Sequence, residues 1–325
     1  NLSSRVLSKF GKNEKWTSDI KLSYNNTAGY NRPITGKDRS SIYAILMLPR
    51  SMDLTDFKAG TNEFGKMLWY PGALAWTPNP YWLYRNNLNN DNRHRFLLNG
   101  SLKYDFTDWL NMEVKGGADI YSTNTESKTY AGGPLANQYN TGKQSFIEKN
   151  FSAMLNAKKE NLIGKFGGSL MLGGNLMDNQ WNSLSVSTGE LEVPNLFSPT
   201  NAKGNPSIGA GISHKKINSL FGSLELNYDQ WLFLTFTERN DWSSTLAKAN
   251  RSYSYPSVSL SYVLTEMLNS MGSSYPDWLS YFKLRASYAS VGNDMGPYRL
   301  YNGYLIGKDP LNHTVANKES LLKNA

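Results

Sequence analysis

The sequence predicts a transmembrane antiparallel β-barrel, and three observations support this fold class. Many segments alternate apolar and polar residues, as strands do when one face meets an apolar medium and the other meets water. The connections between these segments alternate between short and long, as they do in outer-membrane barrels. The mean hydropathy is negative, and the longest apolar run, Ile42 to Leu48, stops at Pro49. Because a transmembrane helix needs roughly 18 or more apolar residues, a helical membrane protein is excluded.

The composition fits a barrel whose lumen and loops are polar. The chain has 325 residues, of which 20 are tyrosine and 9 are tryptophan. Such rings form girdles at both membrane interfaces of outer-membrane barrels, and they also form contact surfaces for sugars and peptides. A soluble β-sandwich can be equally rich in aromatic residues, so the composition supports the barrel without excluding a sandwich.

Two hairpins are predicted in the first half of the chain. The first runs from Arg93 to Ile120 with a turn at Asp105 to Asp108, and the second has its turn at Lys158 to Lys165. The apolar positions of the first hairpin are Phe96, Leu98, Gly100, Leu102, Tyr104, Leu110, Met112, Val114, Ala118 and Ile120. Those of the second are Phe151, Ala153, Leu155, Ala157, Phe166, Gly168, Leu170, Leu172 and Leu176.

Three further strands are predicted between Ser219 and Tyr288, for a total of about nine to eleven in the chain. Their apolar positions are Leu220, Gly222, Leu224, Leu226, Tyr228, Val258, Leu260, Tyr262, Phe282, Leu284, Ala286 and Tyr288. The alternate positions are occupied by serines, Glu225, Asn227, Lys283 and Arg285, and only Phe221 interrupts the polar face of the first strand. We expect the apolar face to meet lipid and the polar face to meet water.

The long connections are expected to be extracellular loops. Thr27 to Asn92 is rich in proline, glycine, asparagine and aromatic residues, and Asn179 to His214 carries three prolines with little periodicity. Asn240 to Ser254 is placed on the same side. Leu264 to Ser280 is then expected at the periplasmic rim, with a helical turn at Thr265 to Met271.

The segment from Lys215 to Asn293 carries three motifs in a fixed order. It contains RNDWSS at 239–244, PSVSL at 256–260 and FKLRASYASVGN at 282–293. This order resembles the back half of the SusC/RagA family, the TonB-dependent nutrient importers of the Bacteroidota outer membrane. Two positions depart from the family pattern, since Ala289 and Trp242 stand where glycine is common.

The resemblance implies a barrel of roughly 22 strands in the cell outer membrane, surrounded by outer-membrane lipid. It also implies a SusD/RagB-like surface lipoprotein as partner, energy supplied through TonB, and a glycan or peptide as substrate. No covalent chemistry is implied. Residues 1–325 are expected to be part of the barrel domain, with the plug domain, the TonB box and the final barrel strands outside this chain.

Two groups of residues are candidates for the functional site. Loop aromatic rings could contact a ligand or the lipoprotein, or they could pack on one another within the loop; they are Trp69, Tyr70, Trp76, Tyr81, Trp82 and Tyr84. The residues that match the family are expected to order the exit of a strand into its loop, because such residues hydrogen-bond their own backbone. They are Arg239, Asp241, Ser243, Ser244, Pro256 and Ser257.

Catalytic, metal and cofactor sites are not expected. The chain has no cysteine, and its three histidines, His94, His214 and His313, lack a spaced partner. Gly60 to Met67 is close to a phosphate-binding loop, but methionine replaces the residue that would bind Mg²⁺. The nearest carboxylate pairs are Glu190 with Glu192 and Glu238 with Asp241, which we interpret as solvated or loop-ordering groups.

The formal net charge of +8 is spread over strands and loops rather than gathered in one stripe, so nucleic acid is not an expected partner. Two other functions remain open. One is a passive outer-membrane channel or a structural or adhesion barrel. The other is a soluble glycan-binding β-protein, in which residues such as Leu224 and Leu260 would face a core.

Overall fold

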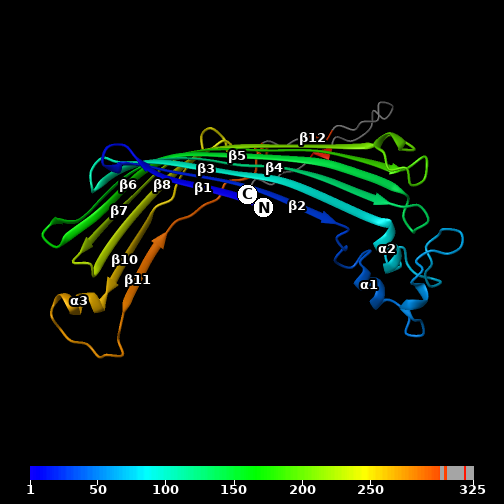
Figure 1. Ribbon diagram of the computed structural model, residues 1–325, viewed down its shortest axis with the longest axis horizontal. Helices are drawn as coiled ribbons and strands as arrows, with labels where there is room; N and C mark the ends of the chain where they lie inside the picture. The colour runs from blue at the N-terminus through cyan, green and yellow to red at the C-terminus, as the bar shows by residue number, and fades with distance from the viewer. Residues whose placement is uncertain (301–303, 306–317, 320–325) are drawn as a thin grey trace.

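The computed structural model describes residues 1–300 and two short strands, β12 (Tyr304–Leu305) and β13 (Lys318–Glu319), which pair with each other. An antiparallel sheet of eleven strands dominates the described chain (Figure 1). Strands β1 to β8 pair in chain order, β10 continues the sheet from β8, β11 follows β10, and β9 also pairs with β8. The strands are β1 (Leu2–Phe10), β2 (Trp16–Tyr30), β3 (Asn87–Asp105), β4 (Leu110–Thr129), β5 (Gln138–Ile163), β6 (Phe166–Glu190), β7 (Ser207–Tyr228), β8 (Leu232–Ser243), β9 (Ser252–Ser254), β10 (Ser257–Val263) and β11 (Lys283–Ala289).

The pairing register places apolar residues of neighbouring strands side by side. One row crosses the sheet through Leu170, Leu224, Phe236, Val258 and Tyr288. The adjacent row, on the opposite face, consists of Ser169, Glu225, Thr235, Ser259 and Ser287. The predicted division into an apolar face and a polar face is therefore confirmed for these strands.

The apolar face is exposed instead of forming a core. Leu170, Leu224 and Phe236 are 41 %, 39 % and 44 % exposed. A row of exposed leucine and phenylalanine is costly in water, because each buried apolar side chain is worth roughly 1.5–3 kcal/mol. This face therefore suits hydrocarbon.

Aromatic rings gather at the end of the sheet where the turns are short. Trp16 and Tyr104 have ring centroids 4.5 Å apart, and Phe166 and Tyr228 have centroids 4.8 Å apart. Trp231 continues this group, 5.5 Å from Tyr228. These positions match an interfacial aromatic girdle.

The strands continue well past the apolar band. On β6 the apolar side chains extend from Phe166 to Leu176, and Asp178 is next on the same face. At roughly 3.3 Å per residue and a tilt near 40°, that segment is about 25 Å tall, the height of the apolar band of an outer-membrane barrel. A charged row of Lys149, Asp178 and Lys216 marks its upper edge.

The structure corrects several loop boundaries. The loops expected at Thr27 to Asn92 and Asn179 to His214 are shorter, at 31–86 and 191–206, because β2, β3, β6 and β7 extend into them. Above the apolar band neither face of a strand keeps a regular series of apolar residues, so the alternation that identifies a strand disappears while the pairing continues. In the same way β8 and β9 reduce the loop expected at Asn240 to Ser254 to residues 244–251.

The turns also differ from expectation. The turn expected at Lys158 to Lys165 is reduced to Gly164 and Lys165, since β5 and β6 pair up to Ile163 and Phe166 after a register shift. The turn after β3 lies at 106–109. The predicted helical turn is confirmed as α3 (Leu264–Ser270).

Short helices lie at the two ends of the sheet. Figure 1 shows α1 (Ser41–Leu46) and α2 (Pro80–Asn86) together at one end of the strands and α3 at the other. The remaining helices are the 3₁₀ turns η1 (Lys12–Glu14), η2 (Leu54–Phe57) and η3 (Pro199–Asn201). In the described part of the chain, every helix is too short to cross a bilayer.

Candidate functional site

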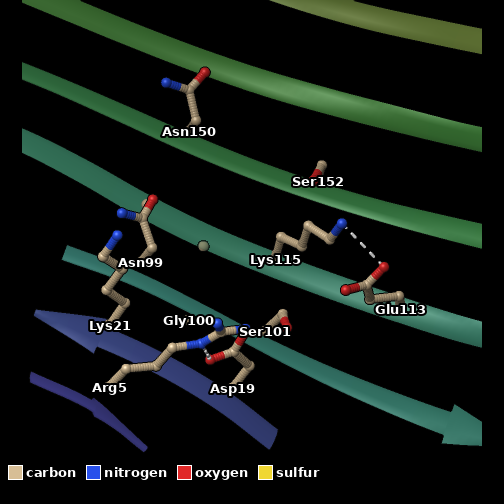
Figure 2. A pocket seen from close by; sticks show the side chains of 12 residues that line it. Arg5, Asp19, Lys21, Asn99, Gly100, Ser101, Glu113, Lys115, Asn150 and Ser152 are labelled. Carbon is tan, nitrogen blue, oxygen red and sulfur yellow. Dashed lines mark hydrogen bonds and ion pairs between the residues drawn. The ribbon is translucent and has the colours of Figure 1, made fainter. Parts of the chain in front are cut away.

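The polar face carries an open hollow across strands β1 to β5. Figure 2 shows its side chains, with Arg5 and Asp19 directed toward each other from β1 and β2, and Lys115 beside Glu113 on β4. The polar side chains of the lining are Arg5, Asp19, Lys21, Asn99, Ser101, Glu113, Lys115, Asn150 and Ser152. Each of the five strands from β1 to β5 contributes at least one of these polar side chains.

The charges in the hollow are largely matched. Arg5 contacts Asp19 with two hydrogen bonds of 2.8 and 2.7 Å, and Lys115 lies 3.0 Å from Glu113. Because each carboxylate is neutralised by a cation, the hollow has no free acid and base pair for catalysis. It offers hydrogen-bond donors and acceptors to a polar ligand or to another polar protein segment.

Residues 31–86 form a small packed unit at the long-loop end. Trp82 on α2 is 2 % exposed, and Ala44 on α1 is fully buried. Asn79 caps α2 by accepting a hydrogen bond from the Tyr81 amide, and its side-chain nitrogen donates to the carbonyl of Leu68 at 2.7 Å. This loop therefore has a core of its own.

Trp82 also joins this unit to the connection between β4 and β5. A Cβ added to Gly133 would lie 2.6 Å from the indole Nε1 of Trp82, and the Met67 amide donates to the carbonyl of Gly132 at 2.8 Å. The absence of a side chain at Gly133 lets the indole lie close to the backbone. The two loops consequently pack as one surface.

The predicted loop aromatics divide into packed and exposed rings. Trp82 is buried, and Trp69 donates from Nε1 to the carbonyl of Thr77 at 2.8 Å. Trp76 and Tyr84 are 45 % and 75 % exposed, whereas Tyr70 and Tyr81 are half-buried. A role in ligand or lid contact stays a prediction for this group, and the exposed rings are best placed for it.

The family-matching residues lie where β8 meets its loop. Arg239 donates to the Asp241 carboxylate at 2.7 Å and to the Ser219 hydroxyl at 2.9 Å. Ser244 accepts from the Lys216 amide at 2.9 Å. Pro256 accepts from the Ser290 amide at 3.1 Å, and Ser257 hydrogen-bonds to Thr237. Pro256 and Ser257 lie at the start of β10, and a role of the whole group in ordering the exit of a strand into its loop stays a prediction.

Asp294 contacts this group through Ser243. Its carboxylate accepts from Lys215 at 2.6 Å, from Thr245 at 3.0 Å and from Ser243, and the side chain is 8 % exposed. Burial raises the pKa of Asp294, but the bonds from Lys215, Ser243 and Thr245 outweigh that effect, so its pKa lies below the usual value. The sequence analysis did not select Asp294, because the family motif ends at Asn293. Its position directly after the motif is the one feature of the sequence that could have indicated a role.

Because the folded pKa of Asp294 is lowered, its contribution to stability is present above the unfolded value near 3.8 and is lost as the pH falls through the folded pKa. At pH 7 we expect Asp294→Asn to lower the free energy of local opening of residues 290–300 by about 1–3 kcal/mol, because the buried donors lose a charged acceptor. Hydrogen exchange of that segment measures the effect. Asp277→Asn, in an exposed loop, is the control, and equal protection in both variants would contradict the expectation.

The other sequence candidates are not assembled into sites. Glu238 and Asp241 lie on opposite faces of β8, so they cannot flank one sugar. Glu190 contacts Lys203 at 3.2 Å. Residues 60–67 form a tight turn closed by a bridge between Thr61 and Met67. Within the described residues there is no group of metal-ligating side chains, and His313 lies outside them.

Comparison with known proteins agrees with this architecture. A family model described as "TonB dependent receptor-like, beta-barrel" matches residues 16–319. The solved structure of the RagAB peptide transporter is similar, with 20 % identity, a TM-score of 0.74, and coverage of 94 % of this chain and 34 % of that chain. The RagAB peptide importer in its closed-closed state has 19 % identity, a TM-score of 0.73, and coverage of 98 % and 35 %. The comparison with curated proteins gave no match.

At these identities the structural likeness shows the fold. This chain spans about a third of the length of the solved chains it matches, since the matched region is 34 % of one and 35 % of the other. The sheet described above corresponds to part of a barrel wall, and the resemblance expected from the sequence motifs is confirmed.

Proposed function

The chain belongs to the TonB dependent receptor-like β-barrel family, and on this premise we propose that it forms part of the barrel wall of an outer-membrane importer for large nutrients. The observation that carries this proposal is the two-faced sheet. An exposed apolar band about 25 Å tall stands against a polar face with matched charges. Such a wall suits lipid on one side and a water-filled lumen on the other.

The lengths of the connections between strands indicate which end of the sheet faces the outside of the cell. Connections of two to four residues, such as 164–165 and 106–109, lie at one end together with the longer segment 264–282 that carries α3. The loops 31–86 and 191–206 lie at the other end. We place the long-loop end outside the cell, as in other outer-membrane barrels. The packed unit of residues 31–86 then faces the medium from which a nutrient arrives.

We further propose a SusD/RagB-like lipoprotein as a lid on the long-loop end, and TonB as the source of energy. The exposed rings of Trp76 and Tyr84 are candidate contacts for the lid or for a glycan or peptide substrate. This chain would bind and guide the nutrient and perform no covalent step.

The proposal can be tested in the native cells with the full-length protein. We expect it in the outer-membrane fraction, together with a surface lipoprotein in near-equal amount after extraction in mild detergent. Uptake of a labelled oligopeptide or oligosaccharide should depend on the gene and should stop when a protonophore collapses the proton gradient. Uptake that persists with the protonophore would instead indicate a passive channel, and a protein that stays dispersed without detergent would indicate a soluble binder.

A further inference from the structure

A row of three aromatic side chains crosses the polar face above the level of the apolar band. Tyr121 of β4 is directly opposite Phe146 of β5, and Phe146 is directly opposite Trp181 of β6. The rings of Tyr121 and Phe146 are stacked, with centroids 4.7 Å apart and an interplanar angle of 16°. All three side chains are half-buried. We refer to them as the aromatic row.

The neighbouring strand leaves space for this row. The indole of Trp181 leans over β7 at Gly211, where an added Cβ would approach its Cζ3 to 2.7 Å. The residue directly opposite Trp181 on β7 is Ser213, a small side chain. The small residues Gly211 and Ser213 therefore leave the indole of Trp181 uncovered by a large side chain of β7.

A cation without a carboxylate partner stands beside the aromatic row. The guanidinium carbon of Arg93 lies 4.7 Å from the centre of the Tyr121 ring, and Arg93 Nε donates to Thr123 at 2.9 Å. Within residues 1–300, Arg93 forms no ion pair, and its side chain is exposed. Nearby Arg95 is different, because Asp119 binds it with bonds of 2.8 and 2.5 Å.

We propose that the aromatic row and Arg93 form a binding site for an oligopeptide that carries an apolar or aromatic side chain and a carboxylate. The indole of Trp181 stacks on the side chain, the Tyr121 and Phe146 rings contact it with their edges because their facing sides are stacked on each other, and the free nitrogens of Arg93 pair with the carboxylate, for which a planar guanidinium is well suited. A neutral saccharide could stack on the rings but would leave the guanidinium without an anion. This assignment rests on the proposed function, since it requires the polar face to line a water-filled lumen.

The full-length protein, purified in detergent, provides the test by calorimetry. The probes are acetyl-Gly-Phe-Gly-Gly with a free carboxylate and the same peptide with a terminal amide. Arg93→Gln should weaken binding of the acid about tenfold, as expected for a charge-assisted hydrogen bond, and leave the amide unchanged. Trp181→Ala should weaken binding of both probes by about 2- to 12-fold.

Controls separate binding from folding. Phe151→Ala removes a ring from the apolar face of β5, the strand that carries Phe146, and should not change the affinity. Trp181→Phe should recover most of the loss if Trp181→Ala acts through stacking. The heat-induced shift in gel mobility reports whether each variant barrel is folded.

The proposal is overturned if neither peptide binds, if folded Trp181→Ala and Arg93→Gln proteins bind like the wild type, or if a neutral glucose hexasaccharide is the only probe whose binding depends on Trp181. These results differ from a failure of the import function. Energised uptake that is unaffected by Trp181→Ala removes the site and leaves the importer intact, whereas absent uptake in the wild type removes the importer.

Discussion

Leu224→Arg should destabilise the barrel by about 2–4 kcal/mol, the cost of a cation near the middle of a lipid-facing surface. Leu224 lies on the apolar face, directly opposite Leu170 and Phe236, and it is 39 % exposed without lipid. It is four residues above the girdle residue Tyr228, which places it about 10 Å into the band. Unfolding of the full-length protein by urea in lipid vesicles, followed by tryptophan fluorescence, measures the loss.

Ser223→Arg is the matched control, because Ser223 is the preceding residue of β7 and points to the polar face. It lies opposite Met171 and Thr237. We expect a cost well below that of Leu224→Arg, since the guanidinium stays in water. Equal costs at the two positions would show that the faces are not divided between lipid and water.

Trp82→Ala should destabilise the packed loops by an amount similar to or greater than the cost of Leu224→Arg, and it should leave the barrel strands folded. Truncating a buried tryptophan costs about 3–5 kcal/mol, and the side chain of Trp82 is 2 % exposed. Because the indole contacts Gly133 in the connection between β4 and β5, both loops should become mobile together. Hydrogen exchange and limited proteolysis should detect loosening of residues 31–86 and 130–137, while the barrel still shows its heat-dependent gel shift.

Tyr84→Ala is the control, because it truncates an exposed ring of the same helix and keeps the buried Trp82. Tyr84 lies two residues after Trp82 on α2 and is 75 % exposed. It should leave the protection of both loops unchanged. Gly133→Ala should reproduce the Trp82→Ala effect, because the added Cβ would lie 2.6 Å from the indole. If the loop around Gly133 keeps its protection in Trp82→Ala, the two loops do not depend on each other.

The sequence predicts this fold well wherever one face of a strand meets lipid. There the side chains alternate, so the faces around Leu224 and Leu260 could be read directly from the chain. Above the band both faces meet water, and the selection for apolar residues at alternate positions ends. The upper halves of β6 and β7, with residues such as Asn182 and Ser213, therefore resembled loops although they form a continuous ladder of pairs.

The candidate sites were less predictable because they depend on register. Nothing local links Tyr121 to Trp181, which are 60 positions apart and fall in one row, on either side of Phe146, only when β4, β5 and β6 are aligned. Asp294 likewise needs the tertiary position of Lys215 to acquire its role. Composition left open whether Trp82 contacts a ligand or packs within its loop, and only the structure shows that this ring is the core of the loop.

The long strands also determine how a membrane-anchored protein can reach the mouth of the barrel. On β6, pairing continues from Asp178 to Glu190, which raises the loops about 30 Å above the edge of the apolar band at a tilt near 40°. A protein held in the outer leaflet by an acyl chain must bridge that height before its folded part touches Trp76 or Tyr84. At about 3.3 Å per extended residue, its tether needs at least about nine residues between the lipid and the first folded element.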